Sequence, residues 1–580
     1  MHPYHHYHNY DVDPKIKIKG QDDAVQVGYN SIRQHLVDAM AKGEKRFCLD
    51  LYPNVAIAPI LQMLSGIEEL QVFETASAKK PAELLAREHE KYITDDRVFG
   101  KMTYQTLDCC FEDEKAQALR AAIDGCAGAA VVVGVGAGLF MAEADEYFFF
   151  DVTRWEIQLR YRRGEGTWML ENGKAPQLTK YKVGFFIEWR LADKHKKAVF
   201  DRVNYWVDAN LPEEPHWLNA AAFREALSQT VRQPFHMQAY FDASVWGGQW
   251  MKNEFDLDPE AENYGWSFDG VPEENALKFD FGGKTAMFPA MTLVQQQPEA
   301  LLGEHVYGRF GAEFPIRFDY LDTMEGGNLS LQVHPMTSYI QQQFGMHYTQ
   351  DESYYILDAE EESCVYLGLK PGVDKAEMYA ALKEANAGGV PFDAEKFVNK
   401  IPVKKHDHVL IPAGTVHCSG KNTTVLEISA TPYIFTFKMW DWGRVGLDGI
   451  PRPVHLDHAF QNIQFNRDTD WVMGQLIHQE QTLRTEEGGM VEKTGLHNLE
   501  FIQTERYNLT GSVTALQQDS VMVVNLVEGR EALIESVSGS FDPYTVHYGE
   551  TIVIPAGAGA VKFTAVPDAG ETKIMTAYVR

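Results

Sequence analysis

Hydrophobic and polar positions follow two different patterns along the chain, and the change falls near residue 216. Before that point, apolar residues at helical spacing alternate with short, continuous apolar runs. The pattern predicts helices over 31–42, 53–64 and 115–125, and buried strands over 46–51, 129–136 and 147–152. Strands that alternate with helices are typical of a parallel sheet with crossover helices. We therefore expect an α/β unit over residues 20–215, after a disordered or extended lead-in over 1–19.

The pattern after residue 216 is that of an all-β protein. A connecting helix is expected over 217–231, within a linking segment 216–232. Beyond it come short, aromatic-rich apolar runs punctuated by turn residues, which favour a barrel or a sandwich. A small helical insertion is predicted around 373–400, with helices over 375–386 and 393–399.

An internal repeat indicates that the β-rich part holds two barrels. The run His408-Val409-Leu410-Ile411-Pro412-Ala413-Gly414 recurs as Thr551-Ile552-Val553-Ile554-Pro555-Ala556-Gly557. A strand that enters a Pro-Ala-Gly turn is a recurring piece of a jelly-roll barrel. We expect one barrel over 233–465 and a second over 466–580. The second copy has Ala560 where the first offers His417, so the second barrel is expected to be structural and free of metal.

Composition and charge limit the classes of partner. The net charge of −29, from 53 basic and 82 acidic residues, argues against nucleic acid or an anionic membrane as a partner. A small anionic substrate requires Lys and Arg residues at its binding site whose positive charge outweighs the negative net charge of the protein. The six cysteines form no CxxC pair, which is typical of a reduced, cytoplasmic protein. No apolar run has the roughly 18–20 residues of a membrane-spanning helix, and the His-rich start, Met1 to His8, is interpreted as part of the polar lead-in.

The α/β unit lacks a working phosphate loop. A Walker A motif needs GxxxxGK[ST], but the glycine turn at 134–138 has no following Lys, and the first strand leads into residues 50–54 without glycine. The strand that ends in Asp151 precedes a helix with Arg154, Arg160, Arg162 and Arg163. This arrangement weakly resembles the strand and lid of uridine-kinase-like P-loop kinases, which implies a kinase-like fold without kinase activity. The alternative is a solvated Arg-rich helix that forms salt bridges with the acidic surface.

Candidate metal ligands are concentrated between residues 331 and 417. In Leu331-Gln332-Val333-His334-Pro335, Gln332 and His334 share one face of a short strand, because side chains alternate across a strand. Glu352 follows 18 positions after His334, and His417 follows 65 positions after Glu352. One amide oxygen, two imidazoles and one carboxylate, with a position left for water or substrate, suit a catalytic zinc ion.

These residues carry a resemblance to the type I mannose-6-phosphate isomerases, which are zinc-dependent cupin proteins. The resemblance covers roughly residues 233–580, and its most specific parts are LSLQVHP at 329–335 and IPAGTVH at 411–417. It implies that Gln332, His334, Glu352 and His417 hold one Zn²⁺ per chain. It also implies interconversion of mannose 6-phosphate and fructose 6-phosphate, with Ser330 beside the phosphate and Glu427 as a pocket carboxylate.

The chain departs from this family at two positions. Gln350 stands where the family has Lys, and Lys438 is the basic residue nearest to the position of a family Arg. Because Arg and Lys are not interchangeable in clamping an oxyanion, we expect phosphate binding by Lys438, Arg444 or Arg452.

Aldose–ketose isomerisation must stabilise an enediolate while a proton moves between C1 and C2, and a carboxylate, an imidazole or a metal-bound hydroxide can carry that proton. From the positions that match the family, we predict Lys438 and Glu427 as catalytic residues and Ser330 and Arg444 as substrate-binding residues. Two alternatives remain open. One is an isomerase for a different sugar phosphate, and the other is a metal-binding cupin that senses sugar or sugar phosphate without turnover.

Overall fold

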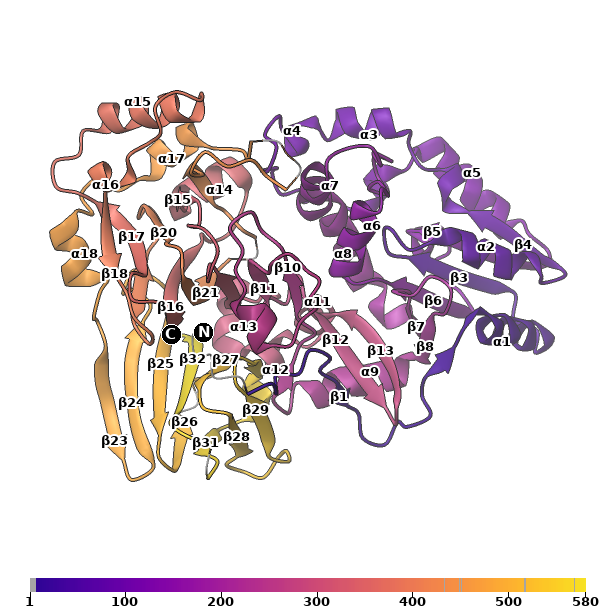
Figure 1. The fold of residues 1–580 in the computed structure, drawn as a ribbon. Coiled ribbons are helices and arrows are strands. Elements are labelled where there is room, and N and C mark those ends of the chain that lie inside the picture. The colour runs from indigo at the N-terminus through magenta and orange to yellow at the C-terminus, as the bar shows by residue number, and fades with distance from the viewer. Residues whose placement is uncertain (1–6, 432, 448, 450, 516–517, 568) are drawn as a thin grey trace.

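The structure is a computed structural model that describes residues 7–431, 433–447, 449, 451–515, 518–567 and 569–580. An N-terminal α/β unit lies beside a β-rich part that takes up the rest of the chain (Figure 1). Of the lead-in predicted over 1–19, residues 1–6 lie outside the described residues. None of the helices within the described ranges combines the length and apolar character needed to cross a membrane.

A seven-stranded sheet forms the centre of the N-terminal unit, and its inner strands run parallel. Two antiparallel strands, β8 and β2, extend one edge. In sheet order the strands are β2 (Gln26–Val27), β8 (His216–Asn219), β7 (Tyr205–Asp208), β6 (Glu146–Asp151), β3 (Arg46–Leu51), β5 (Ala129–Val135) and β4 (Leu70–Glu74). The accompanying helices are α1 (Tyr29–Ala41), α2 (Ile57–Ser65), α3 (Ala82–Glu88), α4 (Glu90–Ile93), α5 (Asp113–Asp124), α6 (Arg154–Arg162), α7 (Gln177–Val183), α8 (Trp189–Val199) and α9 (Ala220–Thr230). The predicted alternation of strands and helices is confirmed.

A carboxylate of the protein itself accepts hydrogen bonds from the backbone N–H groups of the glycine turn after β5. The backbone N–H groups of Ala137 and Gly138 donate to the carboxylate of Asp50 at 3.1 and 2.9 Å. Tyr147 and His195 also contact this buried carboxylate. These two donors are therefore satisfied by the protein itself, and the similarity to P-loop kinases stays a prediction.

Two of the four predicted arginines are structural, whereas Arg162 and Arg163 are exposed and pair with Asp242 and Glu156, as the alternative of a solvated helix predicts. Arg154 and Arg160 are buried. Arg154 pairs with Asp193 and Glu273, and Arg160 donates to backbone carbonyls of the residues that follow β7. A buried guanidinium requires such partners, because desolvation without them is costly.

Two antiparallel sheets form the first barrel of the β-rich part. The six-stranded sheet runs β10 (Tyr240–Asp242), β11 (Trp266–Phe268), β14 (Arg317–Asp322), β21 (Thr423–Ala430), β16 (Asp351–Ala359) and β19 (His408–Ile411). The five-stranded sheet runs β18 (Val398–Pro402), β17 (Cys364–Leu369), β20 (His417–Ser419), β15 (Leu331–Val333) and β22 (Phe437–Trp440). The predicted insertion contains α15 (Lys375–Asn386) and α16 (Ala394–Phe397). Paired antiparallel sheets are consistent with the expected cupin-like barrel.

A second pair of antiparallel sheets follows. The seven-stranded sheet runs β23 (Gln481–Glu486), β24 (Gly489–Gly495), β25 (Ile502–Leu509), β32 (Thr572–Val579), β27 (Met522–Glu528), β30 (Thr551–Ile554) and β9 (Phe235–His236). The four-stranded sheet runs β26 (Ser512–Ala515), β31 (Val561–Ala565), β28 (Glu531–Ser536) and β29 (Tyr544–His547). The two copies of the sequence repeat form β19 and β30. Ile411 of β19 pairs with Glu352, whereas the matching Ile554 of β30 pairs with Met522. The second barrel thus has an apolar residue at the position of the first barrel's carboxylate.

The segments that join these parts differ from the predicted boundaries. The helix expected over 217–231 begins at Ala220, because the preceding residues form β8 in the N-terminal sheet. Strand β9 joins the seven-stranded sheet of the second barrel, although it precedes the first barrel in sequence. Helix α18 (Thr469–Gln475) packs beside β17 of the first barrel. The described part of the lead-in is extended and contains β1 (Ile16–Lys17), which pairs with β12 (Ala276–Phe281).

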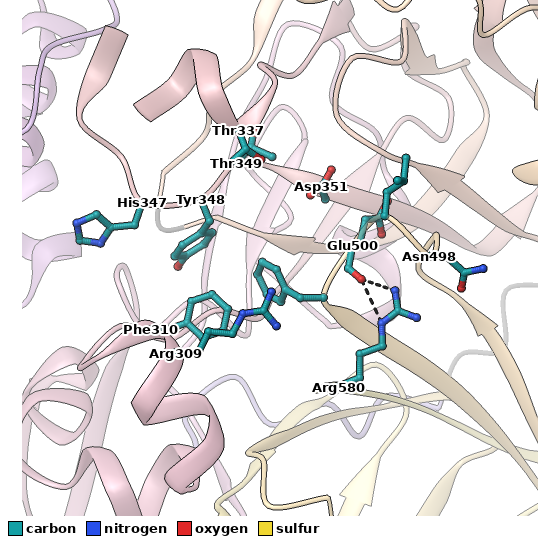
Figure 2. A pocket seen from close by; sticks show the side chains of 12 residues that line it. Arg309, Phe310, Thr337, His347, Tyr348, Thr349, Asp351, Asn498, Glu500 and Arg580 are labelled. Carbon is teal, nitrogen blue, oxygen red and sulfur yellow. Dashed lines mark hydrogen bonds between the residues drawn. The ribbon is translucent and has the colours of Figure 1, made fainter. Parts of the chain in front are cut away.

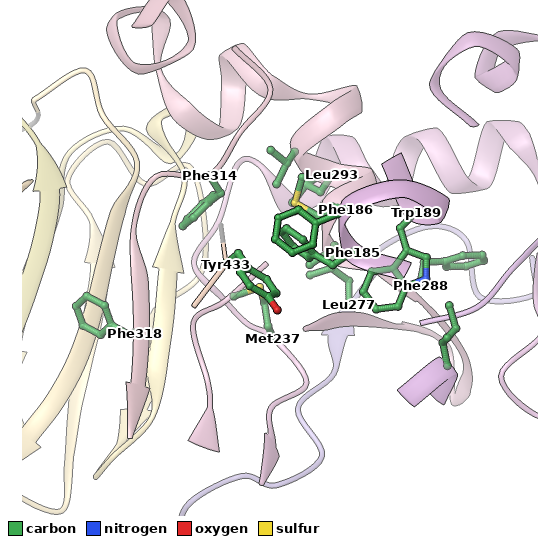
Figure 3. Close-up of a cluster of buried hydrophobic side chains, with 14 of the residues drawn as sticks. Phe185, Phe186, Trp189, Met237, Leu277, Phe288, Leu293, Phe314, Phe318 and Tyr433 are labelled. Carbon is green, nitrogen blue, oxygen red and sulfur yellow. The ribbon is translucent and has the colours of Figure 1, made fainter. Parts of the chain in front are cut away.

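One hydrophobic core joins the N-terminal unit to the first barrel. Phe185, Phe186 and Trp189, from the N-terminal unit, lie near Tyr433 and Met237 of the β-rich part (Figure 3). The rings of Phe185 and Tyr433 are 4.3 Å apart between centroids. Because this contact is buried and aromatic, separating the two parts would expose a large apolar surface to water.

Candidate metal centre and adjoining cavity

Three strands of the first barrel bring the four predicted ligands together. Gln332 on β15 is directly opposite His417 on β20 in the five-stranded sheet. His334 follows β15 by one residue, and Glu352 lies near the start of β16 in the facing sheet. The turn at Gly414 also meets the ligand segment, since its N–H donates to the His334 carbonyl at 3.0 Å.

The two imidazoles and the carboxylate form a compact, fully buried cluster. Nε2 of His334 is 3.0 Å from Oε2 of Glu352, and Nε2 of His417 is 2.8 Å from Oε1 of the same carboxylate. The ligand atoms of these three residues all lie within 4.8 Å of one another, and the three side chains are 0% exposed. It is the one such group among the residues that the structure describes.

Backbone carbonyls fix the tautomer of both histidines. Nδ1 of His334 is 2.8 Å from the carbonyl oxygen of Phe435, and Nδ1 of His417 is 2.9 Å from that of Thr415. A carbonyl oxygen only accepts hydrogen bonds, so each Nδ1 carries a proton, and Nε2 is the nitrogen that faces Glu352 and would bind a metal ion. This is the arrangement of histidines that bind metal. The residues present therefore fit a zinc ion.

Gln350 connects the cluster to a second buried carboxyl group. Its amide nitrogen donates to Glu352 at 2.9 Å and to Glu427 at 3.3 Å. Its amide oxygen accepts from the N–H of Phe435 at 3.0 Å. At this position, where the resemblance predicts a lysine, the chain has a neutral donor that also holds the backbone beside His334.

Burial and neighbouring charges set opposite protonation states for the two glutamates. Although burial favours the neutral acid, His334 and His417 hold the pKa of Glu352 well below its usual value. Burial, with Asp319 and Glu352 as negative neighbours, raises the pKa of Glu427 well above its usual value. Glu352 is thus a carboxylate suited to a cation, and Glu427 is a neutral acid.

A cavity of about 670 Å³ adjoins the cluster. Gln332 lines this cavity, and its amide nitrogen is 3.2 Å from Nε2 of His417. Lys438 also lines it and is opposite Gln332 on β22. Burial, followed by the charge of Arg452, lowers the pKa of Lys438 to about 7. Within the described residues, the Lys438 ammonium makes no hydrogen bond or ion pair, which leaves it available to a ligand.

The other predicted substrate residues lie at different depths. Ser330 lines the cavity and donates to Asp441 at 2.7 Å. Arg452 also lines it and donates to the Ser330 hydroxyl at 3.1 Å. Arg444 is outside the lining and pairs with Asp441 at 2.8 Å. The geometry thus favours Arg452 over Arg444 as the arginine that meets a ligand. Glu427 is likewise outside the lining and reaches the cluster through Gln350.

Several residues of the site carry no sequence signal that would have placed them there. Phe435 orients both His334 and Gln350 through its backbone, and any residue type except proline offers the same two groups. Arg452 was one of three basic candidates, and only the path of the loop before it selects it. The cavity lining also includes residues of the N-terminal unit, such as Arg97 and Gln158.

A second cavity, of about 580 Å³, has Asp351 of β16 in its lining (Figure 2). Asp351 lines it, whereas the next residue, Glu352, belongs to the metal cluster, because successive strand residues point to opposite faces. Arg309 and Arg580 also line this cavity, and Arg580 donates to the carbonyl of Glu500. The fourth predicted ligand, Gln332, lines the first cavity and not this one, so the first cavity is the candidate site.

Comparisons with known proteins find similarity over parts of the chain. Residues 28–232 match a family described as a domain of unknown function (DUF8485). The chain is 23% identical over 330 residues to the mannose-6-phosphate isomerase of Streptococcus mutans serotype c, which covers 56% of this chain and 93% of the relative. It is 23% identical over 332 residues to the mannose-6-phosphate isomerase ManA of Bacillus subtilis, covering 57% and 95%.

A solved structure, that of the mannose 6-phosphate isomerase from Bacillus subtilis, has a TM-score of 0.48 and 20% identity, over 60% of this chain and 99% of that one. The curated relatives are thus mannose-6-phosphate isomerases, from which this chain has diverged to low identity, and the similarity supports a sugar-phosphate isomerase.

Proposed function

We propose that the chain is a zinc-dependent aldose–ketose isomerase that interconverts mannose 6-phosphate and fructose 6-phosphate through an enediolate. The observation that carries the proposal is the buried cluster of His334, Glu352 and His417, with the Nε2 atoms of both histidines within 3.0 Å of one carboxylate. Gln332 is the fourth proposed ligand, because a rotation of its amide would present the oxygen instead of the nitrogen. The names of the curated relatives add independent support.

The proposed chemistry divides between the metal and the side chains around it. A bound zinc supplies Lewis-acid stabilisation of negative charge on the sugar oxygens. Lys438, with a pKa of about 7, is suited to take a proton from one sugar carbon and return it to the other. Glu427 stays neutral beside the ionised Glu352, so we assign it a positioning role. Ser330 and Arg452 bind the phosphate, with Arg444 holding Asp441 behind them.

The test is a coupled assay for conversion of mannose 6-phosphate to fructose 6-phosphate, with and without chelator, together with metal analysis. His334→Ala is expected to abolish metal-dependent turnover. His347→Ala is the matched control, because the His347 side chain is 73% exposed and lies outside the cluster. Turnover that persists at the same rate in chelated protein and in His334→Ala would contradict the proposal.

A second candidate function is a metal-binding cupin that senses a sugar phosphate without converting it. Gln350 favours it, because a neutral amide committed to Glu352, Glu427 and Phe435 replaces the family's lysine. Tight zinc binding without turnover on a panel of hexose phosphates would support the sensor. Turnover of another hexose phosphate in preference to mannose 6-phosphate would instead identify an isomerase with a different substrate.

A further inference from the structure

The cavity beside the metal cluster has a wall that comes from the N-terminal unit. We call this surface the N-terminal wall, and it consists of Arg97, Val98, Gln158, Arg162, residues 176–178 and Tyr181. The facing side of the cavity contains Gln332, Ser330, Lys438 and Arg452 of the first barrel. A ligand that fills the cavity therefore contacts both parts of the chain.

Buried polar contacts hold the N-terminal wall in place. The amide of Gln158 donates to Glu274 at 3.0 Å, and the hydroxyl of Tyr181 donates to the other oxygen of the same carboxylate. Glu274 is buried and lies in the β-rich part, next to the Glu273 that pairs with Arg154. Partners of this kind are costly to separate, because each would leave a polar group desolvated.

Aromatic and ionic contacts continue the attachment at the cavity's edge. The ring of Trp155 on α6 stacks on Tyr240 of β10, with centroids 3.9 Å apart and an interplanar angle of 11°. Arg162, at the end of α6, forms a two-point ion pair with Asp242. These contacts therefore hold the N-terminal wall in a fixed position beside the first barrel.

Positive charge is concentrated on both sides of the cavity, in a chain whose net charge is −29. Arg97 and Arg162 come from the N-terminal wall, and Lys438 and Arg452 come from the barrel. Asp242 partners Arg162, and Asp441 partners Arg452. Arg97 donates to the carbonyl of Pro451 at 3.2 Å, which brings its guanidinium to the segment that carries Arg452. Guanidinium groups on two walls of one cavity suit a phosphate.

We propose that the N-terminal unit forms half of the sugar-phosphate site, with Arg97 binding the phosphate group together with Arg452 and with Leu178 as an apolar part of the wall. This inference rests on the proposed function for the identity of the ligand. The curated relatives are covered almost completely by little more than half of this chain. The N-terminal wall would therefore distinguish this protein's substrate selection from theirs.

The experiment measures binding by titration calorimetry on the full chain, with mannose 6-phosphate and with mannose. Arg97→Gln removes the charge but keeps a donor for the Pro451 carbonyl, and we expect it to weaken binding of mannose 6-phosphate about tenfold or more. Binding of mannose should change little. Arg97→Lys should fall between wild type and Arg97→Gln. Leu178→Trp fills the cavity and should weaken both ligands.

Arg87→Ala is the matched control, because Arg87 is an exposed arginine of the N-terminal unit outside the cavity. It should leave both affinities unchanged. In an active protein, Arg97→Gln should raise KM for mannose 6-phosphate with kcat nearly unchanged, as expected for lost uniform binding.

The outcomes separate this inference from the proposed function. If the wild type binds mannose 6-phosphate without turnover and Arg97→Gln weakens that binding, the role of the N-terminal wall is supported and the isomerase assignment is wrong. If turnover occurs but Arg97→Gln and Leu178→Trp match the wild type in affinity and KM, the isomerase assignment is supported and the proposed role of the N-terminal wall is wrong. A wild type that binds neither mannose 6-phosphate nor inorganic phosphate overturns the proposed role of Arg97.

Discussion

Replacing Gln350 by methionine removes three hydrogen bonds from the metal centre while keeping the length and volume of the side chain. The amide nitrogen of Gln350 donates to Glu352 and Glu427, and its oxygen accepts from the N–H of Phe435. Methionine fills the same space, so the variant tests the polar contacts rather than a cavity.

The hydrogen-bond geometry gives the expected size of the effect on stability. Without the amide oxygen, the buried N–H of Phe435 is unsatisfied, which costs about 1–3 kcal/mol. Loss of the 2.9 Å donor to the ionised Glu352 removes a charge-assisted bond, worth about 1.5–3 kcal/mol. The 3.3 Å contact with the neutral Glu427 adds less. The free energy of unfolding of the metal-free protein should therefore fall by about 3–5 kcal/mol.

Metal affinity should fall as well, because Gln350 orients a ligand from outside the cluster. Loss of such a contact typically weakens metal binding by about 10–100-fold. Competition between the protein and a chromophoric chelator for zinc measures this change, and urea denaturation measures the stability. Gln342→Met is the matched control, since Gln342 is exposed on α14 (Thr337–Phe344). Zinc affinity and stability equal to wild type in Gln350→Met would refute the role assigned to this amide.

Three further predictions concern other parts of the chain. Burial lowers the pKa of Lys438 from 10.5 to about 7. Below pH 7 the ammonium is charged in both the folded and the unfolded protein, so its burial lowers the free energy of unfolding by the full amount. This destabilisation decreases above pH 7 and is gone at about pH 10.5, where the side chain is neutral in both states. Lys438→Met should therefore raise the free energy of unfolding more at pH 6 than at pH 10, and equal gains in urea denaturation at both pH values would contradict this. Phe99 stacks on Phe435 with ring centroids 5.2 Å apart, so Phe99→Ala should cost about 3–5 kcal/mol and weaken zinc binding. Phe73→Ala, a buried control on β4, should leave zinc affinity unchanged in the folded protein, and equal zinc affinities for the two variants would argue against the coupling. Calorimetry should detect no ATP affinity, because Asp50 accepts from the amides of the glycine turn, and micromolar binding would require a different nucleotide site.

Local sequence pattern was sufficient for most elements and for the metal ligands. The strand at 46–51 and the helix at 375–386 agree with β3 and α15 at both ends. The metal ligands could be predicted from the sequence because two motifs, each within a strand and its turn, fix His334 and His417 relative to the backbone. Their tautomers depend on the carbonyls of Phe435 and Thr415, which are backbone groups without a sequence signature.

Contacts between residues far apart in the sequence could not be predicted from local sequence pattern. Residues 217–219 belong to the predicted helix over 217–231, yet they lie in β8, because pairing with β7 satisfies their backbone groups. The choice between Arg444 and Arg452 depends on how the loop after β22 returns to the cavity. The contact of Arg97 with the Pro451 carbonyl joins residues from opposite ends of the fold, and neither residue type indicates the other.

Strand β9 also affects how the protein is made and how it can be divided. Phe235 and His236 leave the ribosome about 300 residues before Val553 and Ile552, the partners that complete their pairing. Such distant pairing slows folding, so β9 remains an unsatisfied edge while the first barrel is synthesised. A fragment that ends near residue 465 would keep β9 but lack its sheet, and a fragment that begins near 466 would lack the strand. The two barrels are therefore better expressed as one chain than as separate pieces.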